Sequence, residues 1–337
     1  MLNYTIRRLM FSIPVLLFIS FIIFLILDLA PSDPTGNLPL TIPPETRAKI
    51  REAMGLDQPM IVRYLLWCKQ FFINEPLNIW DQWRGTCSFN CEDRLRVLSY
   101  TTRSPVVDLI VQRLPQTLWV VGMSYVVGIL IAIPIGVISA YRQYSIFDQA
   151  GTFVSMVGFS VPPFFSGVLV IIIFSVQLGW FPSIYDTTLE VTDWESFMAQ
   201  VRQMIMPVMV LALQTTAQIS RFMRASMLDN LNQDYVRTAR AKGLKESVVL
   251  LVHVLRNSLI PVVTVIALGV PAVFGGAIIT EQVFKVNGIG QLLIIGIQGG
   301  DAPLVQTLTF IFAVLIVLFN LIADVLYGIL DPRIRYD

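Results

Sequence analysis

The sequence predicts an all-α integral membrane protein, and three observations support this fold class. Hydrophobic residues make up 55% and charged residues only 14% of the 337 residues, and the mean hydropathy is +0.68. Soluble domains usually contain about 25% charged residues. Long stretches without charge recur along the chain, and basic residues gather between alternate stretches.

Six stretches meet the requirement for a transmembrane helix, which is about 20 mainly apolar residues. They lie at 10–27, 114–140, within 149–185, around 203–220, at 258–280 and at 302–323. The third run exceeds one span, so we expect a kinked or widened helix at Pro162 and Pro163. Residues 286–300 are too few and too rich in glycine to cross, and we expect an interfacial or re-entrant turn there.

Basic residues on short loops indicate the orientation, because they are enriched on the cytoplasmic side. One side carries Arg7, Arg8, Arg142, the seven basic residues from Arg221 to Arg256, Arg333 and Arg335. The opposite short loops carry only Arg202 and Lys285. We therefore expect both termini to be cytoplasmic. Residues 1–30 would form an uncleaved first transmembrane helix, since their apolar core exceeds the roughly 7 to 15 residues of a signal peptide.

The predicted organisation continues with an extracytoplasmic segment at 31–113 and a core of five transmembrane helices at 114–337. In the segment, Pro43 and Pro44 favour the start of a short helix that Gly55 ends. A second helix from Met60 places one set of side chains on a single face: Ile61, Tyr64, Leu65, Cys68 and Phe72. That face either lies along the bilayer surface or packs on neighbouring spans.

The cysteines of the extracytoplasmic segment suggest one local disulfide. Cys87 and Cys91 would lie where thiols can oxidise, which leaves Cys68 free. The alternative is two unpaired thiols. Two cysteines are too few for a structural zinc site, and we expect no metal site.

Motifs for catalysis and for ATP binding are absent from the sequence. It has no GxxxxGK[ST], HExxH or GxSxG pattern and a single histidine, so we expect no catalytic residues. The spans contain very few ionisable groups, although ion-driven transporters usually bury several. Uncharged polar residues in the spans are candidates for a translocation path: Ser160, Gln214, Thr215 and Gln218. Hydrogen bonding between helices is the alternative use of such residues.

The loop at about 229–258 contains the densest charge of the core. In DYVRTARAKGL, Asp234 is expected to cap a helix with Val236, Ala239 and Ala241 on one face, and Gly243 to allow a turn into a second helix at 245–258. The small residues, the glycine and the aromatic side chain suggest a surface that docks into another protein, whereas a plain topology anchor needs only charge. The candidate docking residues are Asp234, Tyr235, Arg237, Ala239, Arg240, Lys242, Gly243 and Leu244.

DYVRTARAKGL followed by HVLRNSLIPVV resembles the EAA loop of ABC importer permeases, in the variant found in peptide permeases. Arg237 stands where the general pattern has Glu. The chain start, RLPQTL at Arg113, GGAIITEQVFKVNGIGQLL at Gly275 and LDPRIR at Leu330 resemble the B-type subunit of oligopeptide, dipeptide and nickel importers. The resemblance covers nearly the whole chain and departs from the family at about 74–102.

The resemblance implies the type I ABC importer permease architecture, with six transmembrane helices and an extracytoplasmic insert between the first two. Implied partners are a homologous C-type permease subunit, two ABC ATPase subunits and an extracytoplasmic solute-binding protein, in the lipid bilayer of a prokaryotic inner membrane. ATP and Mg would be bound by the ATPase subunits, with no cofactor and no nucleic acid on this chain. The loop around Gly243 would be the coupling helix.

The expected solutes are di- or oligopeptides. The same resemblance also allows nickel chelates, glutathione or oligosaccharides. A stand-alone ion-coupled carrier or channel is the competing class, and the few ionisable residues in the spans argue against it.

Overall fold

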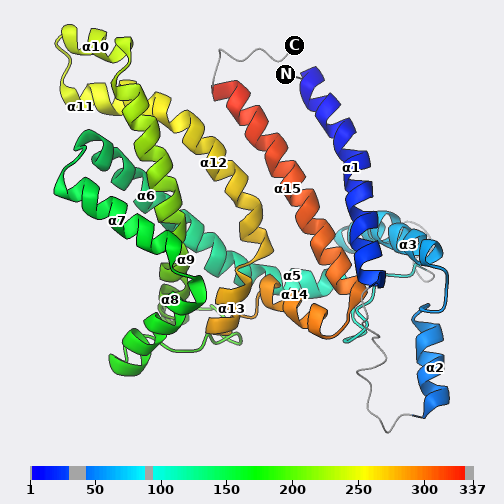
Figure 1. Cartoon of the computed structure of the whole chain (residues 1–337). Coiled ribbons are helices and arrows are strands. Elements are labelled where there is room, and N and C mark those ends of the chain that lie inside the picture. Colours follow the sequence, from blue (N-terminus) through cyan, green and yellow to red (C-terminus); the bar gives the residue numbers. More distant parts are fainter. Residues whose placement is uncertain (1, 30–42, 88–93, 331–337) are drawn as a thin grey trace. The chain divides into compact units, whose positions relative to one another are not determined.

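The structure is a computed structural model that describes residues 2–29, 43–87 and 94–330 (Figure 1). Within these ranges the chain is helical and contains no strand, apart from one isolated bridge between Leu98 and Pro105. Some helices contain π-helical turns, labelled η. The elements are α1 (Leu2–Leu29), α2 (Pro44–Ala53), α3 (Met60–Lys69), η2 (Gln70–Asn74), α4 (Glu75–Arg84), α5 (Val106–Thr117), η3 (Leu118–Gly122), α6 (Met123–Tyr141), α7 (Ile146–Ser160), α8 (Pro163–Val170), η4 (Ile171–Gln177), α9 (Trp194–Leu231), α10 (Asp234–Ala241), α11 (Glu246–Val248), η5 (Val249–Val254), α12 (Leu255–Gly275), α13 (Ile278–Phe284), α14 (Ile289–Gln298) and α15 (Ala302–Leu330).

Five continuous helical stretches of the described chain are long and apolar enough to cross a membrane. They are Thr5–Leu29, Val106–Tyr141, Trp194–Leu231, Glu246–Gly275 and Ala302–Leu326. Two bent helix pairs, α7 with α8–η4 and α13 with α14, raise the number to as many as 7 if each is one span. The six predicted spans fall within this range, and the all-α membrane fold is confirmed.

Proline and glycine determine where two of the spans break. The chain bends by 104° between Ser160 and Pro163, because a proline lacks the helical N–H and forces the residue before it into an extended conformation. The predicted kink is therefore a full break. The predicted fifth span at 258–280 was wrong at its end: α12 stops at Gly275, Gly276 has a φ of +74°, and Thr280 lies in α13.

Two compact units form in the chain. Unit 1 comprises Met1–Leu9, Pro115–Gly290 and Ile316–Asp337, and unit 2 comprises Met10–Leu114 and Gln291–Leu315. In unit 1, α6 lies along α9 at close range because glycines of α6 face side chains of α9. A Cβ atom at Gly136 would lie 2.6 Å from the Cβ of Met223, and one at Gly128 would lie 2.6 Å from the Cβ of Thr215.

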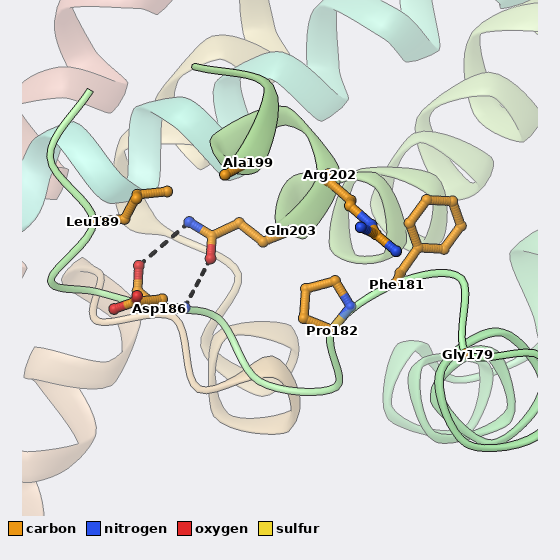
Figure 2. Close-up of a pocket in the computed structure, with 8 residues that line it drawn as sticks. All are labelled: Gly179, Phe181, Pro182, Asp186, Leu189, Ala199, Arg202 and Gln203. Atoms are coloured by element: carbon orange, nitrogen blue, oxygen red, sulfur yellow. Dashed lines mark hydrogen bonds between the residues drawn. The ribbon is translucent and has the colours of Figure 1, made fainter. Parts of the chain in front are cut away.

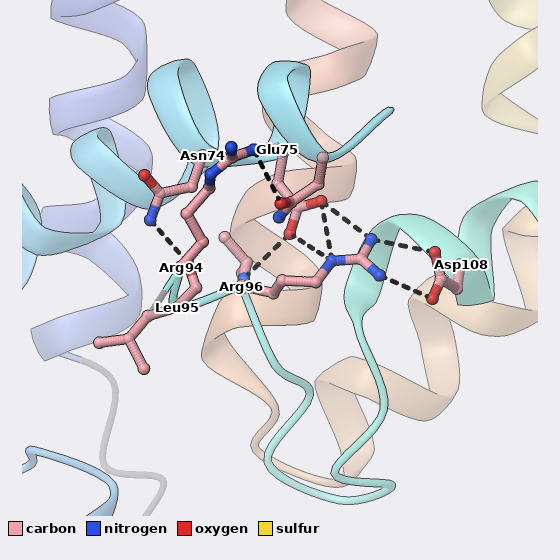
Figure 3. A network of polar contacts seen from close by, with 8 residues as sticks. Asn74, Glu75, Arg94, Leu95, Arg96 and Asp108 are labelled. Atoms are coloured by element: carbon pink, nitrogen blue, oxygen red, sulfur yellow. Dashed lines mark hydrogen bonds and ion pairs between the residues drawn. The ribbon is translucent and has the colours of Figure 1, made fainter. Parts of the chain in front are cut away.

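Unit 2 contains a polar cluster that organises the segment between α1 and α5 (Figure 3). Glu75 is only 2% exposed and accepts hydrogen bonds from the guanidinium of Arg96 and from the main-chain N–H of Val97 at 3.1 Å. Arg96 also donates to both carboxylate oxygens of Asp108 at 3.0 Å. Because a buried carboxylate is costly unless it is paired, this cluster fixes α4 against the chain that leads into α5.

The two helices predicted between the first two spans are confirmed. α2 begins at Pro44, and Gly55 follows it with a φ of +69°. α3 begins at Met60 and continues without interruption through η2 and α4. Cys87 takes part in a disulfide and Cys68 is a free thiol. Cys91 lies outside the described residues, so its pairing with Cys87 stays a prediction.

Candidate functional site

The predicted coupling loop folds as a short helical hairpin between α9 and α12 (Figure 1). Its first arm is α10, and its second arm is α11, which runs through η5 into α12. The turn has the hydrogen bonds of a Schellman motif: Gly243 N–H donates to the Arg240 carbonyl at 2.9 Å, and Leu244 N–H to the Ala239 carbonyl at 3.4 Å. Gly243 has a φ of +77°, which glycine adopts without strain, so the predicted role of this residue in the turn is confirmed.

An ion pair joins the two arms of the hairpin across the glycine. The guanidinium of Arg240 contacts the carboxylate of Glu246 at 2.6 Å through Nη2 and at 3.2 Å through Nε. Hydrogen bonding to Glu246 raises the pKa of the Arg240 side chain above its usual value, so this residue stays charged. Both side chains are partly exposed, at 45% and 39%, and the pair supports the turn from the outside.

The inner face of the hairpin packs on the protein itself. Val236 and Ala239 are 0% and 6% exposed and belong to the same apolar cluster as Met223, Met227 and Val249. Ala239 therefore cannot contact another protein while the hairpin is folded. Its small size instead allows close packing within the subunit. Ala241 is exposed, so the prediction that it shares this face was wrong.

Asp234 does not cap α10 as predicted. The N-cap residue is Gln233, and Asp234 is the first helical residue, with 98% of its side chain exposed. Its carboxylate lies 3.6 Å from the Arg237 guanidinium and is still favourable at a helix start, because it opposes the positive end of the helix dipole. The sequence misplaced the helix start by one residue.

The outer face of the hairpin presents a mixed basic and aromatic surface. Arg237 is 77% exposed, Leu244 is 41% exposed, and Tyr235 is 36% exposed with its hydroxyl on Asn230 Oδ1 at 2.7 Å. Lys242 is exposed and makes no ion pair within the described chain. These side chains form a surface that a partner protein can contact.

The polar residues of α9 separate into two groups. Thr215 faces α6, where a Cβ at Gly128 would meet it, and the hydroxyl of Thr216 donates to the Gly128 carbonyl at 3.2 Å. Gln214 is partly buried and Gln218 is exposed one turn further along. Neither amide has a hydrogen-bond partner within the described part of the chain. Ser160 is exposed at the C-terminal end of α7.

Sequence reasoning did not identify an open pocket of about 440 Å³ between the start of α9 and the loop before it (Figure 2). The amide of Gln203 closes one side of this pocket, since it bonds both main-chain groups of Asp186 at 2.8 and 3.3 Å. Arg202 lines the other side and donates to the Trp180 carbonyl at 2.7 and 2.9 Å. The Thr188 hydroxyl lowers the pKa of the Asp186 carboxyl below its usual value. In the sequence, Arg202 is notable only as one of the two basic residues on the short loops opposite the more basic ones.

Sequence comparison agrees with the helical arrangement. Residues 132–336 match the family described as "Binding-protein-dependent transport system inner membrane component", and residues 1–121 match "Binding-prot-dependent transport system membrane comp, N-term". The chain is similar to the oligopeptide transport system permease protein AppB of Bacillus subtilis, with 40% identity over 337 residues and 100% of both chains covered.

Two further relatives are similar at 35% identity. They are a putative peptide transport system permease protein of Brucella abortus, over 332 residues and 98% of each chain, and the glutathione transport system permease protein GsiC of Escherichia coli K12, over 340 residues and 100% of each chain. Both matched families and all three relatives are components of transport systems. The chain therefore belongs to the binding-protein-dependent transport system inner membrane components, as a permease subunit of an ABC importer with the type I permease fold.

Proposed function

We propose that this permease subunit forms an import path for di- or oligopeptides together with a homologous C-type permease subunit. An extracytoplasmic binding protein would deliver the solute. The full-length similarity to a permease named for oligopeptides carries this proposal. A second similar permease is named for glutathione, which is itself a tripeptide. Nickel chelates and oligosaccharides are the alternative solutes.

A transport assay tests the solute directly. The complete complex with its two ATPase subunits is reconstituted in phospholipid vesicles with the binding protein outside, and uptake of a radiolabelled tetrapeptide is followed. We expect uptake that requires both ATP and the binding protein. Unlabelled peptides should compete, whereas a nickel chelate and an oligosaccharide should not. Uptake of a nickel chelate or an oligosaccharide without peptide competition would contradict the proposal.

We further propose that the hairpin from Asp234 to Glu246 is the coupling element and lies in a cleft of one ATPase subunit. ATP and Mg are bound there, on the partner, and the hairpin transmits the movement. The support is its two-sided construction: Val236 is buried in the subunit's own core, while Arg237, Lys242 and Leu244 remain exposed on a fixed turn. The hairpin and both termini would be cytoplasmic, as the distribution of basic residues indicates.

The path through the membrane is proposed to include the face of α9 that carries Gln214 and Gln218. Thr215, which packs on Gly128, provides a matched control on the same helix. In the assembled importer, Gln218→Cys should react with a small water-soluble thiol reagent in the inward-open state and lose that reactivity when ATP closes the inner gate. Thr215→Cys should stay inert. Inertness of Gln218→Cys and Gln214→Cys in every state would instead indicate that this face contacts other helices or lipid.

A further inference from the structure

One continuous helix of the extracytoplasmic segment has an apolar face that the chain leaves uncovered. α3, η2 and α4 run without a break from Met60 to Arg84, outside the stretches that are long and apolar enough to span a membrane. Three pairs of large apolar residues, seven positions apart, are between 40% and 59% exposed: Leu65 and Leu66, Phe72 and Ile73, Ile79 and Trp80. These six side chains are exposed along one continuous helix and are called the stripe below.

The opposite face of this helix packs within unit 2. The Tyr64 hydroxyl lies 2.8 Å from Ser20 Oγ and 3.3 Å from the Leu17 carbonyl of α1. Trp67 is 5% exposed, donates to Thr307 Oγ1 of α15 at 3.3 Å and meets the Phe310 ring edge-on at 5.8 Å. The helix is thus fixed to two membrane-spanning helices.

These contacts define how deep the helix lies. Ser20 is nine residues before the end of the α1 span at Leu29, which corresponds to about 13 Å at roughly 1.5 Å per residue. Thr307 is five residues inside the α15 span, which starts at Ala302, or about 7 Å. Half of the hydrocarbon core is about 15 Å thick. Tyr64 and Trp67 therefore contact α1 and α15 within their apolar spans and not beyond the ends of those spans, which is the level expected for lipid chains.

We propose that the stripe on α3, η2 and α4 is a phospholipid-binding surface, so that this helix is embedded in one leaflet. Two features favour phospholipid over a protein partner. Lys69 is exposed between Leu65 and Phe72, and its long stem carries the ammonium toward headgroup phosphates while the stem stays among acyl chains. At the far end the Arg84 guanidinium lies 4.7 Å from the Trp80 ring, and tryptophan with arginine is typical of the membrane interface.

The embedded helix connects the lipid leaflet to the extracytoplasmic loops. Glu75, on its packed face, holds Arg96 and through it Asp108. The leaflet thereby holds in place the chain segment that leads into α5. This inference does not depend on which solute the importer carries.

Spin-label accessibility tests the proposal in the complete importer, reconstituted in vesicles of phosphatidylethanolamine and phosphatidylglycerol. Labels are placed by Leu66→Cys, Ile73→Cys and Ile79→Cys in a Cys68→Ser background, with Lys49→Cys on the exposed, polar helix α2 as the control. We expect collisions with oxygen to exceed collisions with a water-soluble nickel chelate at the three stripe positions, and the reverse at position 49. Dominance of the nickel reagent would place the stripe in water, and protection from both reagents would place it against another subunit. Either result overturns the proposal.

A second measurement covers the case in which a labelled variant fails to assemble. A photo-crosslinking phenylalanine analogue replaces Ile73 on the stripe, which is 55% exposed, or Phe71, which stacks on Trp67 at 5.2 Å. We expect phospholipid adducts by mass spectrometry at position 73 and adducts within the chain at position 71. Adducts of position 73 with another protein subunit, and none with lipid, would overturn the proposal.

Discussion

Substitution of Gly243 gives the most specific test of the proposed coupling hairpin, because an added side chain would strain the backbone of the turn without meeting a neighbouring atom. Gly243 has a φ of +77°, and a Cβ atom added there would find no atom within 4 Å. Steric clash is thereby excluded. An L-residue in the left-handed region costs roughly 1–2 kcal/mol, less for asparagine. Gly243→Ala should thus reduce the population of the correctly formed turn by up to about 5- to 30-fold. Gly243→Asn should lose less, and Gly243→Pro the most, since proline fixes φ near −65° and removes the N–H that bonds the Arg240 carbonyl.

The assay measures the affinity of the ATPase subunits for the permease pair and ATP-driven uptake at equal expression. Both should fall in the order wild type, Asn, Ala, Pro at position 243. Gly55→Ala is the matched control, because Gly55 also has a positive φ, +69°, with no atom within 4 Å of a Cβ, but lies between α2 and α3 and not in the hairpin. This control should keep ATPase binding. Full uptake by Gly243→Pro, or equal loss in Gly55→Ala, would refute the coupling role of the turn.

Three further outcomes are expected. Reversing the charge of Arg240 or of Glu246 alone should weaken ATPase binding in pull-down assays, and exchanging the two residues should restore it. If the double variant does not recover binding, Arg240 acts through the partner and not through the ion pair. Gly136→Ala should lower the free energy of unfolding by about 1–3 kcal/mol, because its Cβ would lie 2.7 Å from a main-chain oxygen of α9. Gly151→Ala is the control and should be neutral, because the nearest atom to its Cβ would be 3.5 Å away. Equal melting temperatures of the two variants would contradict this prediction. A thiol-reactive mass tag should label Cys87 only after reduction. Labelling without reductant would contradict the presence of a disulfide at Cys87.

The features that sequence predicted well are those set by local chemistry. Apolar length revealed the spans, and the backbone freedom of glycine located the turn at Gly243. Proline predicted the bend after Ser160, because it lacks the helical N–H and restricts the residue before it. α9 shows where hydropathy stops being informative: it covers Trp194–Leu231, although only 203–220 was predicted. Its polar ends remain helical outside the apolar stretch, and Asp193 starts it with a capping box to Ser196 that the sequence pattern alone could have indicated.

The features that sequence missed depend on contacts between distant residues. Asp301 is fully buried and receives hydrogen bonds from the main-chain N–H groups of Tyr100 and Thr101 at 3.0 and 3.2 Å, about two hundred positions away in the chain. Such pairing follows from tertiary packing, which one sequence does not specify. The ion pair between Arg240 and Glu246 was missed for a related reason: a spacing of six fits no single helix, and only the turn at Gly243 brings the two residues together.

The connection between the hairpin and the membrane-spanning helices explains how a force on the hairpin can reach the membrane. The second arm has no joint with the span that follows, because α11, η5 and α12 are continuous from Glu246 to Gly275. A buried hydrogen bond joins this helix to α9: Ser226 Oγ donates to the Ser258 carbonyl at 2.8 Å. The Ser258 hydroxyl lies 3.2 Å from the Ser226 carbonyl and 2.9 Å from the Val254 carbonyl of its own helix. Coupling requires that nucleotide states of the ATPase favour different permease states. We therefore expect a partner that displaces the hairpin to move α12 together with α9, which carries Gln214 and Gln218, the residues proposed to face the solute.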